Sequence, residues 1–286
     1  MRGPRVVSLL PAATEIVAAL GAGAWLVGVS HECDHPPEVT TLPRVTRAAL
    51  DPDLPSAAID ARVAASRAGA PLVTLDADLL ARLEPDLVIG QSLCDVCAVG
   101  ENLVAQALPR LARRPDTLAL HAHTLAQVFD DIGRTSRALG LDDEAEELVA
   151  GLRYRLARVP RAAGPPPRVL VLEWTDPPYV AGHWVPELIT AAGGFDAGAE
   201  PRAPSRARPW GELRALAPDV VVVSLCGFDV ARARKEAAAV RDPDGRALLD
   251  GRSIFLDGNA YTSRPGPRLV DAAEILGRAL AECHAA

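Results

Sequence analysis

The sequence predicts an α/β protein built from two Rossmann-like lobes that are joined by one long backbone helix. At 286 residues the chain is longer than most single domains, so two lobes are expected. Short apolar runs alternate with helical patterns in both halves, which is typical of βα units around a parallel sheet. The predicted parts are an N-terminal lobe over 1–141, the interlobe helix and linker over 142–163, and a C-terminal lobe over 164–286.

The N-terminal lobe is predicted from apolar runs short enough to be buried strands and from helical patterns between them. Strands are expected at 6–10, 26–29, 72–75, 87–89 and 117–120. Helices are expected at 14–20, 56–68, 77–83, 101–111 and 125–139. This order predicts a parallel sheet with helices between its strands.

The interlobe helix is predicted over 142–159, where apolar residues recur at three- and four-residue spacing. Acidic residues fill its first turn and arginines gather near its end, and both placements stabilise a helix through its dipole. The run Gly164-Pro165-Pro166-Pro167 follows as a stiff segment that ends the helix before the next strand begins. A helix of this kind would allow small rocking motions of the lobes and would resist large closure.

The C-terminal lobe repeats the alternation in a shorter form. Strands are expected at 169–172, 220–225 and 253–256, and helices at 185–192, 210–216, 230–240 and 268–282. The lobe is therefore predicted to carry a second α/β sheet.

Composition excludes several classes of function. The net charge of −7 argues against nucleic-acid binding, which needs a basic surface. No run of 18 apolar residues exists, so we expect a soluble protein. We also expect a monomer. Arg2 and Arg5 precede an apolar stretch, but Pro11 and Glu15 interrupt the resemblance to a secretory signal. We therefore expect a cytoplasmic protein, or a periplasmic or cell-surface one whose signal peptide has been removed.

Polar and aromatic residues follow nearly every predicted strand. Ligands of parallel α/β sheets bind beyond the carboxyl ends of the strands. Aromatic residues make up only 4% of the chain, yet several fall in these loops, where rings would contact a flat ligand. The candidate ligand-binding residues are Pro11, Ala12, His31, Glu32, Cys94, Asp95, Cys97, Glu173, Trp174, His183, Trp184, Cys226, Phe228, Asn259, Tyr261 and Arg264. The alternative is that Trp174 and Phe228 only plug the lobe interface.

Several segments resemble the cobalamin-binding proteins of ABC importers. They are Arg5-Val-Val-Ser-Leu-Leu-Pro-Ala-Ala-Thr-Glu15, Val27-Gly-Val-Ser-His-Glu-Cys-Asp-His-Pro-Pro37, Glu84-Pro-Asp-Leu-Val-Ile89, Asp176-Pro-Pro-Tyr-Val-Ala-Gly182, Ala217-Pro-Asp-Val-Val-Val-Val223 and Ser263-Arg-Pro-Gly-Pro-Arg268. The resemblance spans nearly the whole chain. It implies the class III, helical-backbone fold of substrate-binding proteins. It also implies that a corrinoid, such as cobalamin, binds in an interlobe cleft. The bound corrinoid would serve ABC-type uptake or intracellular handling.

The resemblance also implies roles for individual residues. It places Pro11, Ala12, Glu32, Trp174 and Tyr261 near the ligand. Asp78 and Glu212 lie near the positions where such proteins dock onto an ABC permease. The chain departs from the family at Glu32, where an aromatic residue is usual, and at the Cys94-x-x-Cys97 loop.

Other ligands and chemistries stay open at this stage. Proteins of the same fold bind haem, ferric siderophores or metal ions. Cys94 and Cys97 have the spacing of half a zinc site or a redox dithiol, and His31, Cys33, His183 and Cys226 are further candidate metal ligands. Five cysteines without a dense framework favour reduced thiols that fill tight loops. His31 or His183 could also bond axially to the metal of a macrocycle, whereas His121 and His123 are expected to be exposed loop residues.

No catalytic residue is assigned. Cys94, His31 and Asp34 could be combined into a triad on paper, but the chain has no nucleophile elbow, no phosphate-binding glycine loop and no metalloprotease helix. We therefore predict a binding protein, not an enzyme, with no resident cofactor or metal.

Overall fold

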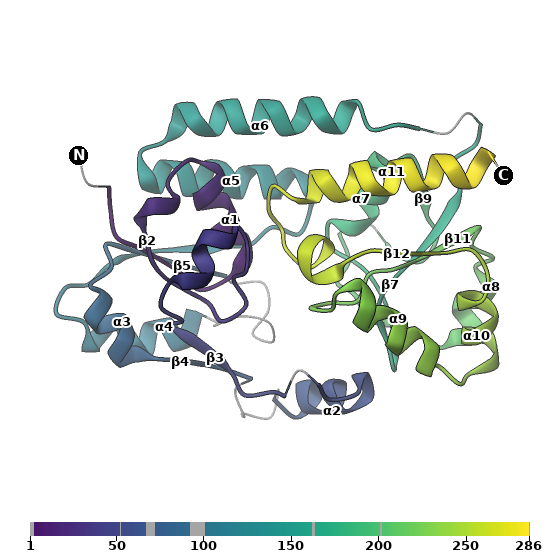
Figure 1. Ribbon diagram of the computed structural model, residues 1–286, viewed down its shortest axis with the longest axis horizontal. Coiled ribbons are helices and arrows are strands. Elements are labelled where there is room, and N and C mark those ends of the chain that lie inside the picture. Colours follow the sequence, from purple (N-terminus) through teal and green to yellow (C-terminus); the bar gives the residue numbers. More distant parts are fainter. Residues whose placement is uncertain are drawn as a thin grey trace. The chain divides into compact units, whose positions relative to one another are not determined.

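The computed structural model describes residues 3–51, 53–66, 72–91, 101–161, 164–200 and 202–285 (Figure 1). The chain divides into two compact units. Unit 1 comprises Met1–Leu54, Ala61–Ala122 and Ala126–Ala150, and unit 2 comprises Pro55–Asp60, His123–Leu125 and Gly151–Ala286. The two-lobed α/β fold predicted from the sequence is confirmed. Two short segments from the first half of the chain nevertheless belong to the second unit.

Unit 1 is built on a four-stranded parallel sheet in the order β2-β1-β5-β6. Its strands are β1 (Val6–Ser8), β2 (Leu26–Val29), β5 (Leu87–Gln91) and β6 (Asp116–Leu120). Most of their residues are buried, as expected for a sheet covered on both faces. The connecting helices are α1 (Pro11–Ala19), α3 (Ala77–Leu83), α4 (Glu101–Ala107) and α5 (Leu125–Leu139), with 3₁₀ turns at Gly23–Trp25, Pro37–Thr41 and Leu108–Arg110.

The strand expected at 72–75 does not join this parallel sheet. β4 (Val73–Leu75) pairs antiparallel with β3 (Thr46–Ala48), an element that the sequence did not predict, in a separate two-stranded sheet. Val73 is buried while Thr74 is exposed, which suits a ribbon with one solvated face. The apolar run was therefore assigned to the right conformation and to the wrong sheet.

The long connecting helix is α6 (Asp142–Ala157), whose 16 residues extend roughly 24 Å. Residues up to Ala150 belong to unit 1, and the rest to unit 2. Near its end, the guanidinium of Arg155 donates to Asp271 (2.6 Å) and to Glu274 (2.9 and 2.7 Å) on α11 (Leu269–Ala285). These bonds hold the pKa of Glu274 below its usual value. They fix the last turns of α6 to the C-terminal helix.

Unit 2 contains a six-stranded mixed sheet with the order β10-β8-β7-β11-β12, in which β9 also pairs with β7. The strands are β7 (Arg168–Thr175), β8 (Pro178–Val180), β9 (Phe195–Asp196), β10 (Arg206–Ala207), β11 (Val220–Val223) and β12 (Ser253–Phe255). β7, β11 and β12 are parallel, β8 pairs antiparallel with β7, and β10 pairs antiparallel with β8. The sequence predicted the parallel strands and missed this edge, because its strands have only two or three residues.

The helices of unit 2 are α7 (Val185–Ala191), α8 (Trp210–Ala215), α9 (Val230–Ala239), α10 (Pro243–Leu249) and α11, together with a π-helical turn at Gly258–Thr262. Side-chain caps begin two of these α-helices, with Asp229 before α9 and Asp242 before α10. α10 was not predicted, although Asp242 caps it and Pro243 stands at its first position, a common helix start. α2 (Ser56–Ser66) begins in unit 2 and continues into unit 1. Within the described ranges, no helix is long and apolar enough to cross a membrane.

Gly258 is the tightest backbone approach in the loop after β12. A Cβ atom at this position would lie 2.0 Å from the carbonyl oxygen of Leu225. We predict that Gly258→Ala destabilises the protein by about 1–3 kcal/mol, because backbone must move to admit the methyl group. Denaturant unfolding measures the change.

Gly151→Ala is the matched control. Gly151 lies inside α6, and a Cβ there would meet nothing within 4 Å. This substitution should stabilise the protein by up to about 1 kcal/mol. Equal effects of the two substitutions would contradict the packing described for Gly258.

Candidate functional site

The end of β7 and the loops that follow β11 and β12 meet at the carboxyl ends of these strands in the unit 2 sheet. The hydroxyls of Ser224 and Thr262 lie 2.6 Å apart. The Phe228 carbonyl accepts from the backbone N–H groups of Gly258 and Asn259, at 3.0 and 3.2 Å. The Cys226 N–H donates to the Glu173 carbonyl at 2.9 Å. The structure thus brings together the end of β7 and the predicted residues of the loops after β11 and β12, which are Cys226, Phe228, Asn259, Tyr261 and Arg264. Glu173 and Trp174 were expected in a loop, but they lie inside β7, which continues to Thr175, and Trp174 pairs with Tyr179 of β8.

Trp174 and Phe228 are mostly covered by protein atoms. Only 9% and 8% of these residues are exposed, and both belong to the hydrophobic core of unit 2. Their ring centroids lie 5.1 Å apart, and the Arg232 guanidinium stands 4.9 Å from the centroid of Phe228. Both rings are therefore part of the packed core of unit 2.

The segment Pro55–Asp60 covers Trp174. The Ser56 hydroxyl donates to Oε2 of Glu236 (2.6 Å), and the indole N–H of Trp174 donates to the Ser56 carbonyl (3.3 Å). Oε1 of Glu236 accepts from Nε of Arg232 at 2.8 Å. Ser56 is 1% exposed and Glu236 8%. Sequence reasoning missed this contact, since nothing in a helix-starting serine indicates a partner 180 residues away.

His183 and Trp184 lie between β8 and α7 and reach the same edge. The Trp184 indole donates to the Thr262 carbonyl at 2.9 Å, and the His183 ring stacks on Trp184 at 5.6 Å between centroids. Nδ1 of His183 lies 3.3 Å from Nδ1 of His123. Burial, and the neighbouring His123, lower the pKa of His183, so its ring is neutral at pH 7. His123 is exposed as predicted, but its contact with His183 was not foreseen.

Tyr261 and Arg264 differ in accessibility. Arg264 is 3% exposed and donates to the side-chain oxygen of Asn259 at 2.9 Å. Tyr261 is only partly buried, and the Arg268 guanidinium lies 5.1 Å from its ring centroid. Among the predicted aromatic residues, Tyr261 therefore offers the most accessible ring in the loop after β12.

The predicted residues of unit 1 lie at the carboxyl ends of β1 and β2. Pro11 and Ala12 are buried in the first turn of α1. Nδ1 of His31 lies 2.7 Å from the Thr46 hydroxyl, and Nε2 lies 4.0 Å from Oε1 of the exposed Glu32. Burial, and then the charge of Arg44, lower the pKa of His31. The lowered pKa favours the neutral ring, and Thr46 holds one of its nitrogens.

The cysteines of the predicted site divide into two groups. Cys94, Asp95 and Cys97 lie outside the described residues. Cys33 and Cys226 form no disulfide among the described residues, and Cys33 is buried with its sulfur 3.1 Å from the Thr14 hydroxyl. Among the residues that the structure describes, no group of three or more His, Cys, Asp or Glu side chains could hold a metal ion.

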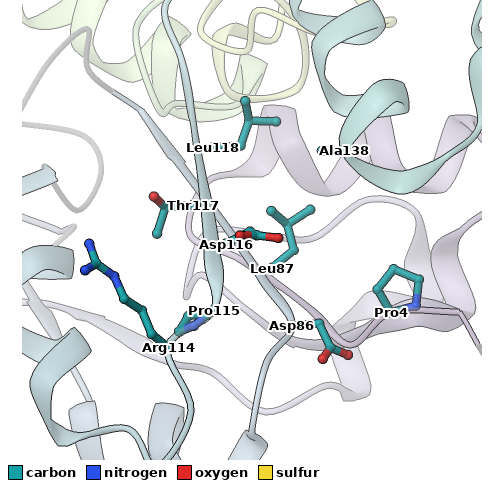
Figure 2. Close-up of a pocket in the computed structure, with 9 residues that line it drawn as sticks. All are labelled: Pro4, Asp86, Leu87, Arg114, Pro115, Asp116, Thr117, Leu118 and Ala138. Carbon is teal, nitrogen blue, oxygen red and sulfur yellow. The ribbon is translucent and has the colours of Figure 1, made fainter.

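A pocket of about 500 Å³ opens at the opposite edge of the unit 1 sheet. Asp86 and Leu87 at the start of β5, and Arg114 to Leu118 around the start of β6, line it together with Pro4 and Ala138. Figure 2 shows Pro4 and Arg114 at opposite ends of this set. A second pocket, of about 380 Å³, lies between β5, β6 and α4. Neither pocket includes a predicted site residue, so the candidate site rests on the loops and not on a cavity.

Removing the Ser56 hydroxyl tests whether its hydrogen bond to Glu236 holds the segment Pro55–Asp60 over Trp174. We predict that Ser56→Ala destabilises the protein by about 1–3 kcal/mol, because Glu236 then stays buried with one hydrogen bond fewer. Tryptophan fluorescence during denaturant unfolding reports the change close to the contact.

Ser66→Ala, at the far end of α2, serves as the control, since the Ser66 hydroxyl bonds only locally to the Val63 carbonyl (2.8 Å). Its effect should stay within about 0.5 kcal/mol. If Ser56→Ala were as mild as Ser66→Ala, the bond to Glu236 would not hold the segment.

Two α/β lobes with polar loops at the carboxyl edges of their sheets define a ligand-binding protein. A model of the periplasmic binding protein family matches residues 6–240, and the chain belongs to this family. The predicted non-enzymatic, substrate-binding class of ABC transporters is thereby confirmed.

Individual relatives are similar over nearly the whole chain. A vitamin B12-binding protein of Vibrio cholerae serotype O1 is 25% identical over 281 residues, which cover 94% of this chain and 86% of the relative. The periplasmic haem-binding protein RhuT of Roseiflexus sp. RS-1 superposes with a TM-score of 0.69 at 25% identity and covers 99% of both chains. The periplasmic vitamin B12-binding protein BtuF of Vibrio cholerae gives a TM-score of 0.66 at 22% identity, with 99% of this chain and 98% of BtuF covered, and supports the fold alone.

Proposed function

We propose that this protein binds a corrinoid such as cobalamin, for ABC-type uptake or for intracellular handling. The observation that carries the proposal is the near full-length similarity to vitamin B12-binding proteins, 25% over 281 residues. The family-like segments, among them Arg5–Glu15 and Val27–Pro37, lie at strand ends in the fold. The predicted loops at the carboxyl edges of both sheets are the proposed ligand-binding surface.

The chemistry of these loops suits a corrin. Its ring is flat and largely apolar, and it carries amide side chains that donate and accept hydrogen bonds. The partly buried Tyr261 offers a ring for contact, while Asn259 and Glu32 offer polar groups. His31 and His183 are neutral imidazoles, the form that could bond to a corrin cobalt.

Haem is the second candidate ligand. It is favoured by the structural similarity to haem-binding proteins, which includes a complex of BhuT with two haems at a TM-score of 0.70 and 24% identity. Haem is also flat, but it carries two carboxylates in place of the amides of a corrin. The half-exposed carboxylate of Glu32 would repel those groups, which is why the corrinoid is preferred.

Ligand titration tests the proposal. We expect cyanocobalamin and hydroxocobalamin to bind with one-to-one stoichiometry and a dissociation constant in the low micromolar range or below, measured by calorimetry and by absorbance. Haemin serves as the comparison. Binding of haemin with no heat or spectral change for either cobalamin would assign the protein to the haem-binding class.

Tyr261 tests the placement of the ligand. Tyr261→Ala removes an accessible ring, and we predict that the cobalamin dissociation constant rises about two- to tenfold, which corresponds to a lost aromatic contact of about 0.5–1.5 kcal/mol. Tyr154→Ala is the control, because Tyr154 is 63% exposed on α6 and far along the chain from the candidate loops. Unchanged affinity in Tyr261→Ala would remove this residue from the site.

An ABC permease is the proposed partner. Asp78 lies in the first turn of α3 and Glu212 in the first turn of α8, and their side chains are 72% and 57% exposed. Each is paired with an arginine, Arg110 at 2.7 Å and Arg208 at 3.3 Å. Reversing both charges should abolish stimulation of the cognate permease ATPase and leave cobalamin affinity unchanged.

A further inference from the structure

Two histidines from distant parts of the chain meet within unit 2. His123 lies between β6 and α5, and His183 lies between β8 and α7. Their Nδ1 atoms are 3.3 Å apart, and their ring centroids are 5.4 Å apart with the planes tilted by 43°. The sequence suggested no relation between these residues, because 60 positions separate them.

The backbone of His183 is held in an unfavourable conformation. Its φ of 53° lies in the left-handed region, which a histidine adopts only at a cost in strain. The His183 N–H donates to the Ala203 carbonyl at 2.7 Å, and the Gly182 N–H donates to the Ser205 hydroxyl at 3.0 Å. The chain over 203–205 therefore fixes the left-handed turn, and Trp184 supports the ring from one side.

His123 is tied to the same place by a second contact. The backbone N–H of Leu125, two residues further on, donates to Oε2 of Glu187 at 2.8 Å. Glu187 lies in the first turn of α7, the helix that begins directly after the His183 loop. One short segment of unit 2 thus anchors both histidines, so their separation is set by the fold.

The separation of the two rings matches that of two ligands on one metal ion. Two nitrogen ligands at about 2.0–2.1 Å from a tetrahedral zinc ion lie about 3.3–3.4 Å apart. The Nδ1–Nδ1 distance of 3.3 Å falls in this range.

We propose that His123 and His183 form a chelating site for one divalent transition-metal ion of the zinc type, bound through both Nδ1 atoms. Imidazole nitrogen suits zinc, cobalt, nickel and copper. Two protein ligands leave two tetrahedral positions for water or for a donor group of a bound molecule. This site does not depend on the corrinoid proposal, since it needs only the two rings and their fixed spacing.

Metal titration of the full chain tests the site. The background carries Cys94→Ser and Cys97→Ser, so that this dithiol cannot bind the ion. After chelator treatment and its removal, we expect Zn²⁺ to bind at one equivalent, and Co²⁺ to show the absorption bands of a tetrahedral site. His123→Ala should weaken Zn²⁺ binding at least tenfold, and so should His183→Asn, which tolerates the left-handed backbone.

Two further variants distinguish a metal-binding role of His123 from a purely structural one. His123→Cys should restore Zn²⁺ binding and add a thiolate-to-Co²⁺ charge-transfer band, which a merely structural effect would not produce. His121→Ala is the matched control in the same loop, since Nδ1 of His121 lies 2.6 Å from Nη1 of Arg134. Absence of Zn²⁺ binding in the background protein, or binding that persists in His123→Ala and His183→Asn, would overturn the proposal.

Discussion

The carboxyl end of β11 is the constraint on which unit 2 depends. Its four valines are buried and pair with β7 on one side and β12 on the other. The chain that leaves this strand is held by the bond between Ser224 and Thr262 and by the bonds from the Phe228 carbonyl to the loop after β12. Because β11 is paired on both sides, its end has a fixed position, and these hydrogen bonds hold the loops after β11 and β12 against it. The candidate residues of unit 2 are positioned by these contacts.

Much of this fold could be predicted from the sequence. Buried strands such as Leu26–Val29 and helices such as Leu125–Leu139 have the predicted bounds, because apolar periodicity records burial directly. The strand predictions failed where the segments are too short for apolar periodicity to indicate a conformation. β3, β8 and β10 have two or three residues each, too few to show an alternating pattern, and the antiparallel partner of Val73–Leu75 could not be inferred from a run of three residues.

The candidate site could be predicted in part. The rule that ligands bind at the carboxyl ends of parallel strands located the end of β7 and the loops after β11 and β12, and the structure brings these segments together. Glu173 and Trp174, expected in a loop, belong to β7 itself. Side-chain contacts over long sequence separations could not be predicted. Ser56 with Glu236, and His123 with His183, are pairs that only the folded chain brings into contact. Accessibility could not be predicted either, since Trp174 and Tyr261 carry the same signal in the sequence and differ in burial.

The buried state of Trp174 bears on how a flat ligand could use unit 2. A ligand that stacked on this ring would have to displace Pro55–Asp60, and with it the hydrogen bonds among Ser56, Glu236 and Trp174. Displacement would leave the Glu236 carboxylate with Arg232 as a partner but without the serine, a loss that burial makes costly. Contact through the more accessible Tyr261 carries no such cost.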